Sequence, residues 1–156
     1  MKEFLKVKNV NLSFNNNEIL KELNLTIDQG NFVAITGASG SGKTSLLRVI
    51  CGLESPNQGE IILDNSLLLN KEIFIPAEKR NIGLVIQEKV LFPHLNARQN
   101  IEFGISSKTD KQNLSNEIME KLNIKQLAEK YPHELSGGES QRVAFCLLYT
   151  SDAADE

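Results

Sequence analysis

Apolar and polar residues alternate along the first part of the chain. Residues 4–10 and 23–27 follow this period of two, which is typical of strands with one buried face. Three consecutive asparagines at 15–17 lie between them and predict a turn. Residues 32–36 form a continuous apolar run instead, which predicts a strand buried on both faces. We therefore expect the first half of the chain to consist mainly of strands.

The period changes to that of a helix after residue 42. Apolar residues at helical spacing predict a helix over 43–51, and Gly52 is suited to end it. Short apolar runs at 61–63 and 82–86 predict two further strands. Residues 111–122 place four apolar side chains on one helical face, so helices are expected to dominate the second half.

Length and composition restrict the class of protein. The chain has 156 residues, of which 40% are hydrophobic and 24% charged, and its formal net charge is −3. This hydrophobic share suffices for a packed core, and the charge argues against a protein that coats nucleic acid. No apolar run approaches the roughly 18–20 residues of a membrane span. The two cysteines, Cys51 and Cys146, form neither a metal motif nor a disulfide framework, which favours a reducing compartment.

Residues 37–44 read Gly-Ala-Ser-Gly-Ser-Gly-Lys-Thr and fit the pattern G-x-x-x-x-G-K-[ST] in full. Glycines let the backbone turn its N–H groups toward phosphate oxygens, and the following helix adds the positive end of its dipole. Lys43 is suited to the β- and γ-phosphates of a nucleotide, and the Thr44 hydroxyl to Mg²⁺. We call residues 37–44 the phosphate loop. The candidate nucleotide-binding residues here are Gly37, Ser39, Gly40, Ser41, Gly42, Lys43, Thr44 and Ser45.

A second glycine pair lies about 90 residues further on, in Leu-Ser-Gly-Gly-Glu-Ser-Gln at 135–141, which we call the signature segment. Ser136 and Glu139 have the spacing of a capping box at the start of a helix. Gly137 and Gly138 leave room for another group to approach the exposed N–H donors. Taken alone, the segment is better explained as an ordinary capped helix.

Together, the phosphate loop and the signature segment resemble the ATP-binding subunit of an ABC transporter. The resemblance implies an α/β fold of the P-loop NTPase type, with an antiparallel β subdomain and a RecA-like core over residues 1–86. It implies a Q-loop and a helical subdomain over residues 87–145. In that family the signature segment contacts the γ-phosphate of ATP bound to the opposite subunit, which gives Ser136, Gly137 and Gly138 this role here.

Two further residues acquire a role from the same resemblance. Gln87 matches the glutamine of the family's Q-loop, which ligates Mg²⁺ and helps to place the attacking water; alone it would read as a solvated loop residue. Phe14 stands where the family carries an aromatic ring that stacks on adenine. The alternative for Phe14 is a core phenylalanine at the end of a strand.

The stretches at 76–83 and 92–95 look most like subunits that power bacterial importers for iron, molybdate, sulfate, polyamines or sugars. This implies ATP and Mg²⁺ as ligands and a second nucleotide-binding subunit as a partner. It also implies transmembrane permease subunits, a separate substrate-binding protein and no nucleic acid. The protein is then expected at the cytoplasmic face of the cell membrane, as a peripheral ATPase. Because the family's ATPase does not contact the solute, the solute is not predicted.

The resemblance ends near residue 145. The family continues with a hydrophobic strand ending in Asp-Glu, where the Glu is the general base, and later with a switch histidine; neither occurs in these 156 residues. Residues 146–156 resemble a translated sequencing adapter and are expected to be a non-native tail. Without Asp152, Asp155 and Glu156 the acidic and basic residues are equal in number.

We therefore expect the C-terminal part of the core to be missing and the 156-residue chain to be inactive as an ATPase. Two alternatives remain open, both compatible with nucleotide binding. One is a naturally short module that binds nucleotide without hydrolysing it. The other is a soluble ABC ATPase without a membrane partner.

Overall fold

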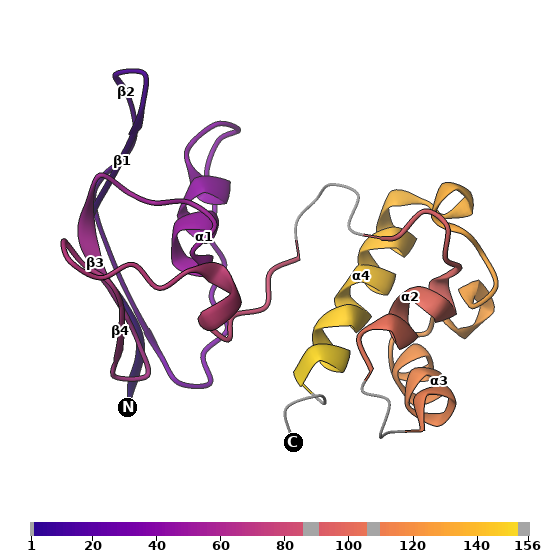
Figure 1. The fold of residues 1–156 in the computed structure, drawn as a ribbon. Helices are drawn as coiled ribbons and strands as arrows, with labels where there is room; N and C mark the ends of the chain where they lie inside the picture. The colour runs from indigo at the N-terminus through magenta and orange to yellow at the C-terminus, as the bar shows by residue number, and fades with distance from the viewer. Residues whose placement is uncertain (1, 86–90, 106–109, 153–156) are drawn as a thin grey trace. The chain divides into compact units, whose positions relative to one another are not determined.

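The computed structural model describes residues 2–85, 91–105 and 110–152, the last four of these by their backbone alone. The chain forms two compact units, Met1–Ile82 and Gly83–Glu156. Each unit has its own apolar core, and Figure 1 shows the strands and helices of both units. The strands lie in the first unit, and all but one of the α-helices lie in the second.

The first unit is built on a four-stranded antiparallel sheet with the order β2-β1-β3-β4. The strands are β1 (Glu3–Phe14), β2 (Asn17–Asp28), β3 (Gln58–Leu63) and β4 (Ser66–Leu69). The strands predicted at 4–10, 23–27 and 61–63 are confirmed. Asn15 and Asn16 make the predicted turn, with φ angles of 47° and 64°, a left-handed backbone that asparagine tolerates well.

One helix, α1 (Lys43–Cys51), accompanies this sheet and has the predicted bounds. Leu46 and Ile50 enter the core that the helix shares with the strands, whereas Leu47 is 41% exposed. Gly52 ends the helix with φ at +79° and donates its N–H to Val49, as expected for a left-handed C-terminal cap.

Arg80, which follows a short 3-10 helix at Ala77–Lys79, binds the same end of α1. Its guanidinium is buried and donates to the carbonyls of Val49 and Ile50 at 2.9 and 2.7 Å, and to that of Ile75 at 2.6 Å. A cation at a helix C-terminus also complements the helix dipole. Burial lowers the pKa of Arg80, although the neighbouring Cys51 opposes this.

Two predicted strands are absent from the described residues. Within the described part of the chain, residues 32–36 form no strand and pair with none, and Phe32 is 98% exposed. Residues 82–85 also lack strand pairing, and Ile86 lies outside the described residues. The predictions were wrong here because an apolar run becomes a buried strand only when neighbouring strands and covering layers satisfy its backbone and side chains.

The second unit consists of three α-helices, α2 (Ala97–Phe103), α3 (Lys111–Lys121) and α4 (Gly137–Asp152). Two 3-10 turns, Lys125–Leu127 and Pro132–Glu134, connect α3 to α4. The helix predicted at 111–122 is confirmed, and its apolar face enters the core of this unit. The sequence pattern did not predict the short helix α2. Within the described part of the chain, no helix is long and apolar enough to span a membrane.

Replacing Arg80 by methionine should destabilise the protein. Methionine fills much of the volume but removes the guanidinium donor from the carbonyls of Ile50 and Ile75 and leaves that of Val49 with the Gly52 N–H, which costs roughly 2–4 kcal/mol. The free energy of unfolding, measured by denaturant titration, checks this. Arg48→Met, which removes an exposed arginine from the same helix, is the matched control and should cost about 1 kcal/mol or less. Equal losses for the two variants would contradict the role of Arg80.

Candidate functional site

The phosphate loop closes around the side chain of its own lysine. The Lys43 ammonium donates hydrogen bonds to the carbonyls of Gly37 and Ala38, at 2.9 and 2.6 Å, and to the Ser41 hydroxyl at 3.3 Å. The loop is therefore already curved, with a positive charge at its centre. An ammonium held by hydrogen bonds to neutral oxygens remains able to pair with phosphate.

Gly42 joins the phosphate loop to α1 at a position where no other residue fits. Its φ is +86°, and a Cβ there would lie 2.9 Å from the carbonyl oxygen of Ile19 and 3.0 Å from Leu20 Cδ2. The start of α1 therefore lies directly against strand β2. Gly40 also has a positive φ, +78°, but a Cβ there would meet no atom within 4 Å, so only the backbone conformation requires glycine.

The N-terminus of α1 has no side-chain cap. The first intrahelical hydrogen bond runs from the N–H of Leu46 to the carbonyl of Gly42, at 2.8 Å. The N–H groups that precede it, on Lys43, Thr44 and Ser45, have no partner within the helix. Helices α2 and α3, in contrast, begin with caps from Asn96 and Asp110. An uncapped N-terminus beside a lysine fits a phosphate group.

Thr44 is exposed in the first turn of α1, where its hydroxyl is accessible to a metal ion bound with the phosphates. No cluster of three or more His, Cys, Asp or Glu side chains suited to a metal occurs among the described residues. Mg²⁺ bound with a nucleotide does not require one, because it keeps several waters and takes phosphate oxygens as ligands. The second predicted magnesium ligand, Gln87, lies outside the described residues.

Phe14 is the last residue of β1, at the tip of the hairpin, and is 48% exposed. It pairs with Asn17 across the turn. The ring is therefore not part of the core, and its face is accessible to a ligand.

The signature segment lies in the second unit, where it starts α4 as the capping-box pattern predicts. The Ser136 N–H donates to the Glu139 carboxylate at 2.8 Å, and the Glu139 N–H donates to the Ser136 hydroxyl at 3.3 Å. Hydrogen bonding of this carboxylate by the Ser136 backbone N–H, and to a smaller extent by the Ser136 side chain, lowers the pKa of Glu139. A Cβ at Gly137 or Gly138 would meet nothing within 4 Å, so the first turn of α4 is open to an approaching group.

A buried asparagine, which the sequence analysis did not single out, holds the segment before α2. Asn100 in α2 is fully buried; its Oδ1 accepts from the N–H of Phe92 at 2.8 Å. Its Nδ2 donates to the carbonyls of Phe92, Leu95 and Asn96. Phe92 in turn stacks obliquely on Phe103, with ring centroids 4.6 Å apart. The signal in the sequence was a polar residue at an apolar position of a short helix.

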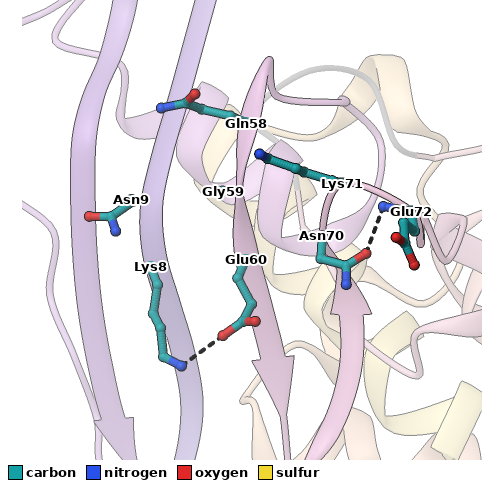
Figure 2. A pocket seen from close by; sticks show the side chains of 8 residues that line it. All are labelled: Lys8, Asn9, Gln58, Gly59, Glu60, Asn70, Lys71 and Glu72. Carbon is teal, nitrogen blue, oxygen red and sulfur yellow. Dashed lines mark hydrogen bonds and ion pairs between the residues drawn. The ribbon is translucent and has the colours of Figure 1, made fainter.

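A hollow of about 600 Å³ on the first unit contains no residue of the phosphate loop and lies over β1, β3 and the segment after β4 (Figure 2). Its lining contains two lysines and two glutamates, and Lys8 already pairs with Glu60 at 2.7 Å. Balanced charge gives it no preference for an anion. It is lined by Lys8, Asn9, Gln58, Gly59, Glu60, Asn70, Lys71 and Glu72.

A glycine-rich loop that leads into an uncapped helix and encloses a lysine, beside an antiparallel sheet, defines a nucleotide-binding protein of the P-loop NTPase type. The family model for ABC transporters matches residues 20–154. The chain belongs to the ABC transporter family and represents part of an ATP-binding domain.

Among curated relatives, the chain is 42% identical over 144 residues to "Fe(3+) ions import ATP-binding protein FbpC" of Haemophilus influenzae, covering 90% of this chain and 41% of that protein. It is 43% identical over 134 residues to the Yersinia enterocolitica protein of the same name, covering 85% of this chain and 38% of that protein. The chain thus spans about two fifths of the length of these relatives.

Solved structures agree with the fold. The ATP-binding cassette MJ0796, in a dimeric post-hydrolysis state with ADP and Pi, matches with a TM-score of 0.80 and 32% identity over 95% of this chain and 70% of that chain. The cbiO1 protein of Clostridium perfringens, part of the ABC transporter complex cbiONQ, matches with a TM-score of 0.79 and 26% identity over 97% of this chain and 63% of that chain.

The capping box predicts a pH dependence of folding stability that follows from the lowered pKa of Glu139. Because folding lowers its pKa below the ordinary value of 4.5, the cap stabilises the fold above that pH, and this contribution is lost as the pH falls through the lowered pKa. Removing the hydroxyl in Ser136→Ala should raise the pKa part of the way back, since the bond from the Ser136 N–H remains. A side-chain NMR titration measures this.

Ser140→Ala serves as the control for this titration, because Ser140 lies in the same helix but outside the cap. It should leave the pKa of Glu139 unchanged. An unchanged pKa in Ser136→Ala would show that the hydroxyl takes no part in holding the carboxylate.

Proposed function

We propose that this chain contains the ATP-binding part of an ABC importer subunit, which couples ATP binding and hydrolysis to solute transport. The observation that carries the proposal is the phosphate loop, in which Lys43 and the uncapped N-terminus of α1 supply positive charge at one place. The names of the curated relatives support ferric iron as the transported ion.

In this proposal each residue of the phosphate loop has a defined task. Lys43 transfers its hydrogen bonds from the carbonyls of Gly37 and Ala38 to the phosphates, and the first N–H groups of α1 bind the same anion. Thr44 offers its hydroxyl to Mg²⁺, with Gln87 as the second ligand. When bound, Mg²⁺ would neutralise charge on the phosphates. Phe14 stacks on adenine through its exposed face.

We propose that the signature segment completes the site in a second copy of the subunit, so that two chains enclose two ATP molecules. Ser136 then offers its hydroxyl, and Gly137 and Gly138 their N–H groups, to a γ-phosphate held by the other chain. The open space over both glycines supports this role. The dimeric state of the similar cassette MJ0796 supports a dimer as well.

We propose that the segment held by Asn100 faces a transmembrane permease at the cytoplasmic side of the membrane, as a peripheral contact. Phe92 and Phe103 expose a pair of aromatic rings there, 37% and 65% accessible. Exposed aromatic residues on a rigid segment are typical of protein–protein contacts. A separate substrate-binding protein completes the proposed importer.

Removing the ammonium of Lys43 should abolish most nucleotide binding. We expect the 156-residue chain to bind Mg–ATP in isothermal titration calorimetry and Lys43→Ala to bind at least tenfold more weakly, because a charge-assisted hydrogen bond contributes about 1.5–3 kcal/mol. Lys111→Ala is the control, since the Lys111 ammonium also donates to a backbone carbonyl, that of Glu102, in the other unit. If both variants bound ATP like the unmodified chain, the phosphate loop would not be the nucleotide site.

We propose further that these 156 residues bind ATP without turning it over. The family's general base follows a hydrophobic strand that does not occur among them. Steady-state phosphate release should therefore equal that of Lys43→Ala, measured at saturating Mg–ATP. Phosphate release that Lys43→Ala abolishes would overturn this proposal while leaving nucleotide binding intact.

A further inference from the structure

Two residues of the β1–β2 hairpin have a left-handed backbone away from its turn. Asn9 has φ of 46° and Glu22 has φ of 43°. Each lies at a β-bulge, because the register shifts between Val7 and Val10 and again between Val10 and Leu12. Asparagine tolerates this conformation, but a glutamate in it is uncommon and requires support from its surroundings.

The support comes from two side-chain amides. Asn24 accepts a hydrogen bond from the N–H of Asn9 at 3.0 Å and donates one to the carbonyl of Glu22 at 2.7 Å. Asn11 accepts from the N–H of Glu22 at 2.8 Å and donates to the carbonyl of Asn9 at 3.2 Å. Each amide therefore bridges both bulged residues, and all four of their backbone polar groups are satisfied. We call Asn9, Asn11, Glu22 and Asn24 the amide cluster.

The amide cluster divides the hairpin into two halves. The inner half pairs with β3; Figure 2 shows Lys8 paired with Glu60 there, and Asn11 of the cluster itself pairs with Gln58. The outer half, from Val10 to Leu20, carries Phe14 at its tip. Its second strand lies against Gly42 at the start of α1. Since bulges bend a strand and increase its twist, the direction of the outer half depends on how the two bulges are held.

We infer that the amide cluster positions Phe14 for the nucleotide base, so that Asn24 acts on adenine binding through a ring it does not touch. The inference rests on the proposed function, in which Phe14 stacks on adenine. Asn24 is a positioning residue: it fixes the bulges at Asn9 and Glu22, and the bulges set the direction of the strand ends that carry the ring.

A purely structural role for the amide cluster would have a different consequence. If the cluster only stabilised the sheet, its loss would weaken the binding of the phosphate groups and of the base alike, because both depend on the folded unit. If it positions Phe14, its loss weakens only ligands that contain the base. Inorganic triphosphate, which has the phosphates and no base, distinguishes the two.

The test measures the dissociation constants of Mg–ATP and Mg–triphosphate for the full 156-residue chain by calorimetry. Phe14→Ala should weaken ATP binding about tenfold, within the range for stacking of one base, and leave triphosphate binding unchanged. Asn24→Ala should weaken ATP binding several-fold and also leave triphosphate unchanged. The double variant should bind ATP no more weakly than Phe14→Ala, because both changes remove the same contact. Thr26→Ala, an exposed residue of the same strand outside the amide cluster, should change neither constant.

The outcomes distinguish a failure of adenine stacking by Phe14 from a failure of the positioning role of Asn24. If Phe14→Ala leaves ATP affinity unchanged, adenine stacking by Phe14 is wrong and the proposed function loses that element. If Phe14→Ala weakens ATP binding and Asn24→Ala does not, or if Asn24→Ala weakens both ligands equally, the positioning role is overturned and stacking remains. Should Asn24→Ala fail to fold, Asn24→Asp keeps the acceptor for the Asn9 N–H and removes the donor to the Glu22 carbonyl and to Asn9 Oδ1. It should then show the same selective loss of ATP affinity.

Discussion

The close contact between Gly42 and strand β2 is the constraint on which the rest of the phosphate site depends. It places the first turn of α1 against the backbone of Ile19, where a side chain at residue 42 would collide with a carbonyl oxygen. The helix therefore begins where the sheet requires it, and its unsatisfied N–H groups open at that edge. The site is positioned by the backbone of one residue that has no side chain.

The other end of α1 is held by a charge. The buried guanidinium of Arg80 satisfies the carbonyls of Val49 and Ile50, so the helix is fixed at its C-terminus by a residue some thirty positions later. With the contact of Gly42 at one end and Arg80 at the other, a helix of nine residues has little freedom to tilt or slide. This matters because the direction of its dipole and the place of Lys43 both follow the helix axis.

Local rules sufficed to predict α1, the Asn15–Asn16 turn and the cap of α4 from sequence, because each depends on residues within one or two turns of the chain. Such local rules failed for residues 32–36. Their apolar run predicted a buried strand, but burial depends on layers that other segments contribute. Arg80 and the amide cluster were missed for a related reason. Each depends on hydrogen bonds between residues 11 to 31 positions apart, and nothing in the spacing of arginine or asparagine indicates them.

The phosphate loop and the signature segment differ in the charged side chains at the start of the helix that each leads into. This difference bears on the proposed dimer. The start of α1 lacks a carboxylate in its first turn and has Lys43 instead. The start of α4 already holds the Glu139 carboxylate, which occupies the Ser136 N–H and offsets the helix dipole. An isolated α4 is therefore a weak site for a free anion, whereas α1 is a strong one. In the proposed function, ATP binds first to the phosphate loop. The signature segment then meets a phosphate whose charge is already partly neutralised by Lys43 of the other chain, so its own carboxylate no longer prevents the contact.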